Sequence, residues 1–117
     1  MTTLGVGIDV VDIERFEAAI NRTPSLRAKL FTPAEATLNT QSLAARFAAK
    51  EALSKALGAP GNLEWHDAEV VSLESGQPTM VLTGTCLARA EQLGGTTTHL
   101  SLSHDGGIAT AILILSR

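Results

Sequence analysis

Four charged side chains lie in a helical stretch of otherwise small or apolar residues, Ala44 to Gly58: Arg46, Lys50, Glu51 and Lys55. At about 100° per residue, Glu51 and Lys55 share one stripe of this helix, and Arg46 and Lys50 share another. A carboxylate flanked by three cations suits a divalent ion with phosphate oxygens, because Mg²⁺ is often held by one or two carboxylates while substrate phosphates and waters complete its octahedron. Equally, Glu51 and Lys55 could form a surface pair worth about 0.3–0.5 kcal/mol.

A further carboxylate, Asp9, interrupts the apolar stretch from Gly5 to Val11. In an extended strand, Val6, Ile8 and Val10 share one face and Asp9 lies on the other. The apolar side chains favour burial of their own face of the strand. The simplest expectation is then that Asp9 lies on the opposite face, exposed to solvent. If Asp9 is instead buried in its ionised form, it requires a cation or hydrogen-bond donors around it.

A third polar segment, HLSLSHD, runs from His99 to Asp105. In a strand, Ser101 and Ser103 share one face, while His104 lies on the opposite one. Serine and histidine at a strand end could donate hydrogen bonds to phosphate, or could be ordinary polar residues of a solvated face. They are too close along one strand to form a catalytic triad, and the chain contains no glycine-rich nucleotide loop and no CxxC motif.

The elements that must position these residues follow from hydrophobic periodicity and from capping residues. Asp12 is a candidate N-cap for a helix that buries Phe16, and Thr32 with Glu35 forms a capping box. Two short helices are expected after Thr23 and after Thr32. The other expected elements are a strand at 5–11, a long helix at 43–57, a hairpin of strands at 68–74 and 79–83, a helix at 85–93, and a second hairpin of strands at 98–104 and 108–115.

This order predicts an α+β fold: one small domain spanning residues 1–117, with an antiparallel sheet packed against one long helix and several short helices. A chain of 117 residues has room for one hydrophobic core. Since aromatic residues make up 3% of the chain, that core must be aliphatic and rich in alanine.

Composition narrows the classes of partner. The net charge of −3 and the few aromatic residues argue against nucleic acid. Seven of the nine Lys and Arg residues lie between Arg15 and Lys55, so one face could suit an anionic partner. The lone Cys86 is expected to be a buried small hydrophobe in a reducing compartment. No secretory signal is visible and the longest apolar run, 108–115, is too short to cross a bilayer, so we expect a cytoplasmic protein that does not enter membranes.

Taken together, the segments resemble the holo-[acyl-carrier-protein] synthase family of small 4′-phosphopantetheinyl transferases. The likeness covers nearly the whole chain in order, and the helix RFAAKEALSKALG is its most specific part. The segments that carry it are GVGIDVVDIERF (5–16), FTPAEA (31–36), RFAAKEALSKALG (46–58), WHDAEVV (65–71), GQPTMVLTG (76–84) and HLSLSHDGGIATA (99–111).

The resemblance implies a reaction and roles for the first three residues. A member of this family transfers 4′-phosphopantetheine from coenzyme A to a serine of an apo acyl carrier protein and releases 3′,5′-ADP. Asp9 and Glu51 match the family's ligands for Mg²⁺, with Mn²⁺ as a possible substitute, and Lys55 matches the lysine that approaches the phosphates. Glu51 and Lys55 are therefore the expected catalytic residues, and either Glu51 or a metal-bound water could deprotonate the serine.

The resemblance also implies binding residues. Arg46, Lys55, Ser103 and His104 match positions that bind coenzyme A, and Gly76 and Pro78 match a turn beside that substrate. Arg15 matches a basic residue that meets the acidic helix of acyl carrier protein. Arg27 and Lys29 extend this basic surface. Family members are typically homotrimers with active sites at subunit interfaces.

The sequence departs from the family pattern in its loops. The connection before the long helix is short, the loop GAPGNLEW (58–65) replaces a Gly-Thr-Gly turn, and Gln77 stands where lysine is common. Two other functions use the same residues: a metal-dependent phosphohydrolase, or a regulatory module that binds coenzyme A or a nucleotide without turnover.

Overall fold

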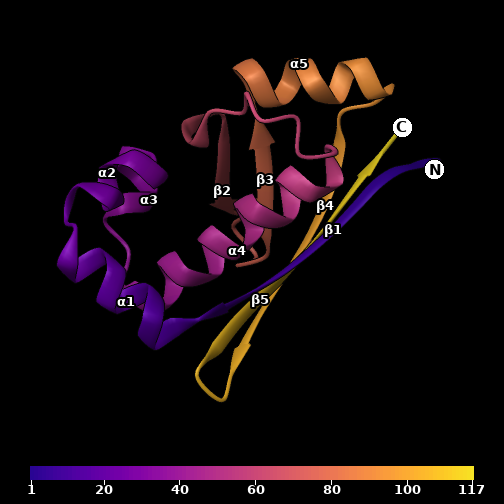
Figure 1. Cartoon of the computed structure of the whole chain (residues 1–117). Coiled ribbons are helices and arrows are strands. Elements are labelled where there is room, and N and C mark those ends of the chain that lie inside the picture. Colours follow the sequence, from indigo (N-terminus) through magenta and orange to yellow (C-terminus); the bar gives the residue numbers. More distant parts are fainter.

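The computed structural model describes all residues from Met1 to Arg117. A long diagonal helix lies against the longer sheet, with short helices gathered near its first residues (Figure 1). In chain order the elements are β1 (Thr3–Asp12), α1 (Ile13–Arg22), α2 (Ser25–Leu30), α3 (Pro33–Ala36), α4 (Thr40–Ala56), the 3₁₀ turn η1 (Trp65–Asp67), β2 (Ala68–Ser72), β3 (Pro78–Leu82), α5 (Gly84–Leu93), β4 (Thr97–Asp105) and β5 (Ile108–Ser116).

The strands form two antiparallel sheets. The larger one has the order β1-β5-β4, and the smaller is the hairpin of β2 and β3. The hydroxyl of Thr98 in β4 donates to the carbonyl of Met80 in β3, across 3.0 Å, and so links the two sheets. The predicted α+β fold with antiparallel strands and one long helix is confirmed.

Local signals in the sequence set several of these boundaries. The carboxylate of Asp12 accepts a hydrogen bond from the backbone N–H of Arg15, and so caps α1. Thr32 and Glu35 form the expected reciprocal capping box at α3. Helix α4 begins at Thr40 rather than at residue 43, because the side chain of Asn39 accepts from the N–H of Ser42 and caps an earlier turn.

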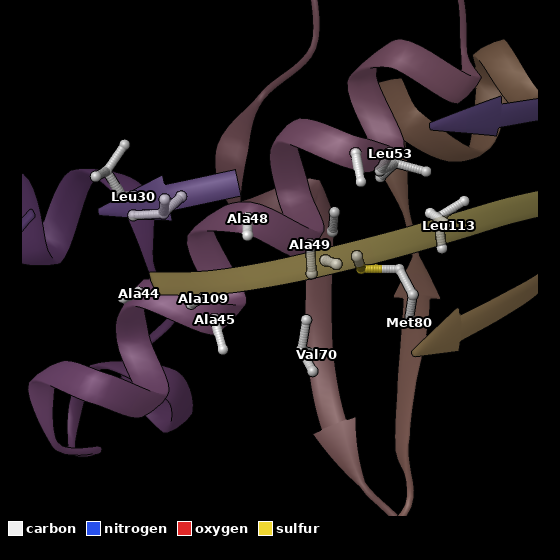
Figure 2. Packing of buried hydrophobic residues seen from close by; sticks show 14 of the residues in the cluster. Leu30, Ala44, Ala45, Ala48, Ala49, Leu53, Val70, Met80, Ala109 and Leu113 are labelled. Carbon is white, nitrogen blue, oxygen red and sulfur yellow. The ribbon is translucent and has the colours of Figure 1, made fainter. Parts of the chain in front are cut away.

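Alanine dominates the packing surface of α4. Figure 2 shows Ala45, Ala49 and Leu53 of this helix among side chains from β2, β3 and β5. Alanine side chains let the helix axis approach the strands closely and cost little conformational entropy. The predicted aliphatic, alanine-rich core is therefore confirmed, and Cys86 is buried within it as expected.

The two faces of β1 are reversed with respect to the prediction. Val6, Ile8 and Val10 face outward, with exposed fractions of 55%, 59% and 58%. The face that carries Asp9 lies instead against α4, because Gly5 and Gly7 on that face have no side chains. A Cβ atom added to Gly7 would lie 1.7 Å from the carbonyl oxygen of Ala52, and one added to Gly5 would lie 2.0 Å from that of Ala56. Backbone thus packs directly on backbone here.

No helix of the structure combines the length and the apolar character that crossing a membrane would require.

Candidate active site

The close contact between β1 and α4 brings Asp9 to Lys55. The ammonium nitrogen of Lys55 lies 3.2 Å from Oδ1 of Asp9 and donates a second hydrogen bond, of 2.8 Å, to the carbonyl oxygen of Ile8. About half of the Lys55 side chain remains exposed, while that of Asp9 is mostly covered. The ion pair of Lys55 is therefore made with the strand, and not with Glu51 one helical turn away.

Glu51 shares this corner with Asp9. Its pKa is raised above the usual value, first because burial disfavours the charged form and second because the negative charge of Asp9 is near; Lys55 opposes the shift. Two carboxylates whose charges repel, with one cation between strand and helix, make a site that gains from a bound cation. The resemblance assigns Asp9 and Glu51 to one metal ion, and this electrostatic coupling indicates that the two carboxylates are near each other.

The donor set of this corner fits a magnesium ion. No group of three or more His, Cys, Asp or Glu side chains gathers in a metal-binding arrangement. Two carboxylates are nevertheless a donor set that Mg²⁺ accepts in proteins, where substrate phosphates and waters provide its other ligands. Asp9 and Glu51 are the residues that could hold such an ion.

A groove of about 820 Å³ runs from this corner between α4, α1 and α2. Glu51 and Asp9 line it, together with the basic side chains of Arg15 and Lys29. Its floor includes Phe47 and Trp65, whose rings stack at a centroid distance of 5.6 Å. The groove thus brings together exposed cations, two carboxylates and aromatic side chains.

Lys50 does not belong to this corner, although the sequence placed it among the cations that flank Glu51. It is only 4% exposed, and its ammonium nitrogen lies 2.7 Å from Oε1 of Glu35. Burial lowers the pKa of Lys50, and the hydrogen bond and charge of Glu35 oppose that shift. The prediction that Lys50 would face phosphate oxygens is wrong, because all three of its N–H donors are engaged inside the protein.

Arg46 lies on the opposite side of α4 from Lys55. Nine residues separate the two, which is about 13–14 Å along the axis and half a turn around it. The guanidinium of Arg46 is 3.5 Å from the hydroxyl of Ser72, its buried Nε has no partner, and burial lowers its pKa. Ser72 pairs with Pro78, so the turn that contains Gly76 ends beside this arginine.

Ser103 and His104 lie on opposite faces of β4. Ser103 is aligned with Thr110 of β5 and shares the outer face of the sheet with it, whereas His104 points inward. A ring nitrogen of His104 lies 3.0 Å from the side-chain amide of Gln41 in the first turn of α4. The residues expected to bind coenzyme A are therefore not gathered at one place within a single chain. Ser103 faces away from His104, and the turn with Gly76 lies beside Arg46, on the opposite side of α4 from Lys55.

Of the three residues expected to meet a protein partner, Arg27 has an internal role. Its guanidinium donates to the carbonyl oxygens of Ala36 and Leu38 at 2.8 and 3.2 Å, and so closes the end of α3. Arg15 and Lys29 are exposed. Sequence reasoning missed the polar neighbours Ser72 and Gln41, which long-range contacts alone reveal.

The chain is similar in sequence to a known superfamily of proteins. A sequence profile described as the 4′-phosphopantetheinyl transferase superfamily matches residues 5–111. The chain belongs to that superfamily. The match includes Asp9, Glu51 and Lys55, and it ends at Ala111 in β5.

Relatives within the superfamily are similar over almost their whole length. The holo-[acyl-carrier-protein] synthase of Beutenbergia cavernae is 60% identical, over 97% of this chain and 98% of that protein. The synthase of Frankia alni is 54% identical with the same coverage. A crystal structure of the Helicobacter pylori synthase in complex with coenzyme A is 29% identical, with a TM-score of 0.84, and the match covers 95% of this chain and 99% of that one.

Proposed function

We propose that this protein transfers 4′-phosphopantetheine from coenzyme A to a serine of an apo acyl carrier protein. The observation that carries the proposal is the meeting of Asp9, Glu51 and Lys55 beside a groove that Asp9 and Glu51 line, in a chain of the superfamily just named. The relatives similar over their full length are synthases that act on acyl carrier protein, and one of them has been crystallised with coenzyme A.

In this reaction the serine hydroxyl oxygen forms a bond to the β-phosphorus of coenzyme A. The bond from that phosphorus to the bridging oxygen breaks, and 3′,5′-ADP leaves. Lys55 offsets the negative charge that grows on the leaving group, because its ammonium group is half exposed beside Asp9 and can reach a phosphate. The serine proton must pass to a base, and Glu51 is the candidate for it among the side chains of this corner.

We propose Mg²⁺ as the metal, with Mn²⁺ as a substitute, held by Asp9 and Glu51. When bound, the ion would neutralise phosphate charge and orient the pyrophosphate. The mutual repulsion of the two carboxylates supports this assignment, because a cation relieves it.

For coenzyme A, the proposed contacts are Lys55 at the pyrophosphate, with Arg46, Ser103 and His104 at the nucleotide end. Gly76 and Pro78 would line the same substrate at the turn beside Arg46. The unpaired, buried Nε of Arg46 supports a phosphate contact there, since a guanidinium matches phosphate oxygens and an orphaned donor is costly.

We propose that the groove binds acyl carrier protein through Arg15, Arg27 and Lys29. Arg15 and Lys29 are exposed cations of a chain whose net charge is negative, so they would attract an acidic partner to one face. Arg27 would contribute mainly by holding α2 in place, through its bonds to the end of α3.

We further propose a homotrimer with active sites at the subunit interfaces. The outer face of β1 and β5 exposes five aliphatic side chains that would favour burial: Val6, Ile8, Val10, Ile108 and Ile112. Ser103 lies on this same face, away from Asp9, so a second copy could join the divided residues. Light scattering should give three chains per particle, and Ile8→Glu should give monomers. A native monomer would contradict the proposal.

We place the protein in the cytoplasm, where its free Cys86 stays reduced.

The deciding experiment incubates the protein with apo acyl carrier protein, coenzyme A and Mg²⁺, with EDTA as the control. Mass spectrometry should show one phosphopantetheine added to the carrier. Cleavage of coenzyme A without transfer would indicate the phosphohydrolase, and tight binding of coenzyme A that ignores Mg²⁺ would indicate the regulatory module. Glu51→Gln should abolish turnover and leave the fold intact, while the matched control Glu91→Gln, on the exposed face of α5, should not alter activity.

A further inference from the structure

Lys50 and Glu35 form a buried ion pair that the proposed reaction does not use. Their side chains are 2% and 1% exposed, and the nitrogen–oxygen distance is 2.7 Å. The ammonium group also lies 5.4 Å from the centroid of the Phe31 ring. Such a pair is not needed for stability alone, because replacing a buried ion pair by apolar residues of similar volume is often neutral or stabilising.

Each polar atom of the pair has a partner on a different segment. The three N–H donors of Lys50 reach Glu35, the carbonyl oxygen of Leu30 at 2.9 Å and that of Trp65 at 3.1 Å. Glu35 accepts from the backbone N–H of Thr32 at 3.0 Å and from that of Val70 at 2.9 Å. One lysine and one glutamate thus join α4 to α2, α3, η1 and β2.

Two of the segments joined to α4 in this way, α2 and η1, line the groove. Leu30 ends α2, the helix that presents Lys29, and Trp65 provides the aromatic floor. Lys50 precedes Glu51 directly in α4, so its bonds fix both walls relative to the helix that carries the reactive corner. The directions of these hydrogen bonds matter, because an apolar side chain could fill the space but could not set where the two carbonyl groups lie.

We propose that Lys50 and Glu35 are positioning residues that hold α2 and Trp65 at a fixed place beside Glu51, and so shape the groove for the carrier protein. The inference rests on the proposed function. It predicts that loss of Lys50 weakens use of the carrier protein and leaves coenzyme A largely unaffected, since none of the proposed contacts of coenzyme A lies on α2 or η1, the segments that Lys50 positions.

The test uses Lys50→Met, together with Glu35→Gln/Lys50→Met, which removes both charges and keeps one amide oxygen that can accept from the backbone N–H of Thr32 or of Val70. The matched control is Arg89→Met, because Nε of Arg89 also donates to a carbonyl oxygen of the α4 segment, that of Leu57 at 2.9 Å, but far from the groove. All are assayed below the unfolding temperature of the weakest variant. Trp65 is the only tryptophan in the chain, so its fluorescence reports on the floor of the groove without any turnover.

We expect both Lys50 variants to raise the KM for apo acyl carrier protein by about tenfold, the equivalent of one lost charged hydrogen bond. The KM for coenzyme A should stay within about twofold, and the Trp65 emission should shift to longer wavelength. The Arg89 variant should change neither. An unchanged carrier KM and emission in a folded Lys50 variant, or equal changes in the control, would overturn the inference. If the native protein transfers nothing, the proposed function fails, and the Trp65 emission alone then decides the positioning role.

Discussion

Two lysines of α4, five residues apart, have opposite surroundings. Lys50 is buried and uses all three of its N–H donors within the protein, whereas Lys55 is half exposed and touches only β1. Both form ion pairs, but the pair of Lys50 with Glu35 is closed to solvent, whereas the pair of Lys55 with Asp9 is partly exposed. The ammonium group of Lys50 is thus neutralised inside the protein, whereas that of Lys55 remains half exposed to solvent.

The comparison shows that the surroundings of a charged residue on a helix depend on which segment packs against it. The capping box of α3 turns Glu35 inward to Lys50, and the glycine face of β1 carries Asp9 to Lys55. Substitutions at the two lysines, at Gly7 of β1 and at Glu51 test this difference, and they are given from the largest expected effect to the smallest.

Lys50→Met should lower the free energy of unfolding by about 3–5 kcal/mol, because it leaves the Glu35 carboxylate buried without a cation. Urea denaturation followed by circular dichroism measures this. A loss similar to that of an exposed lysine would show that Lys50 is not held as described.

Gly7→Ala should cost about 3 kcal/mol or more, since the new methyl group meets the carbonyl oxygen of Ala52 and forces β1 away from α4. The control is Gly61→Ala, where nothing lies within 4 Å and only the positive φ of 84° opposes the change. That control should cost about 1 kcal/mol. If Gly7→Ala and Gly61→Ala lost the same stability in thermal unfolding, Gly7 would not be packed against the backbone of α4 as described.

Lys55→Met should reduce transfer by about a hundredfold or more, equal to about 2.7 kcal/mol of barrier. Its stability should change by less than about 1 kcal/mol, because the pair with Asp9 is partly exposed. Steady-state transfer rates and melting temperatures of the same sample provide both values. A variant that keeps its activity would remove Lys55 from the reaction.

Glu51→Gln should change the pH dependence of stability slightly. Because the pKa of Glu51 is raised in the folded state, that state binds the proton more tightly than the unfolded chain, and ionising Glu51 costs stability as the pH rises through the raised pKa. In metal-free buffer the variant should therefore be more stable at about pH 8 by less than about 1 kcal/mol, since solvent screens this partly exposed group. Melting curves should show the advantage vanish toward about pH 4. A variant less stable than the native protein at high pH would contradict the assignment.

Much of the fold could be predicted from local patterns. The caps at Asp12 and Thr32 and the periodicity of the strands depend on neighbouring residues, and the structure confirms them. The orientation of β1 could not be predicted in this way. Alternation shows that Val6 and Asp9 lie on different faces, but which face is buried depends on the alanines of α4, more than forty positions further along the sequence.

The candidate site likewise contains residues that the sequence identifies and residues whose surroundings it does not reveal. Asp9, Glu51 and Lys55 could be chosen from residue type and from the resemblance, and the structure brings their charges together. Lys50 was misjudged because helical spacing alone gives no sign of Glu35 across the core. The partners of Arg46 and His104, which are Ser72 and Gln41, come from distant segments and left no local signal.

The contact of Gly5 and Gly7 with the carbonyl groups of α4 has a consequence for adaptation. A contact between two backbones has no side-chain rotamers through which it could relax. The spacing between Asp9 of β1 and Glu51 of α4 therefore cannot be adjusted by repacking of side chains. Under the proposed function, variation that suits a different carrier should therefore accumulate in the loops and in α1 and α2, while the contact between β1 and α4 stays unchanged.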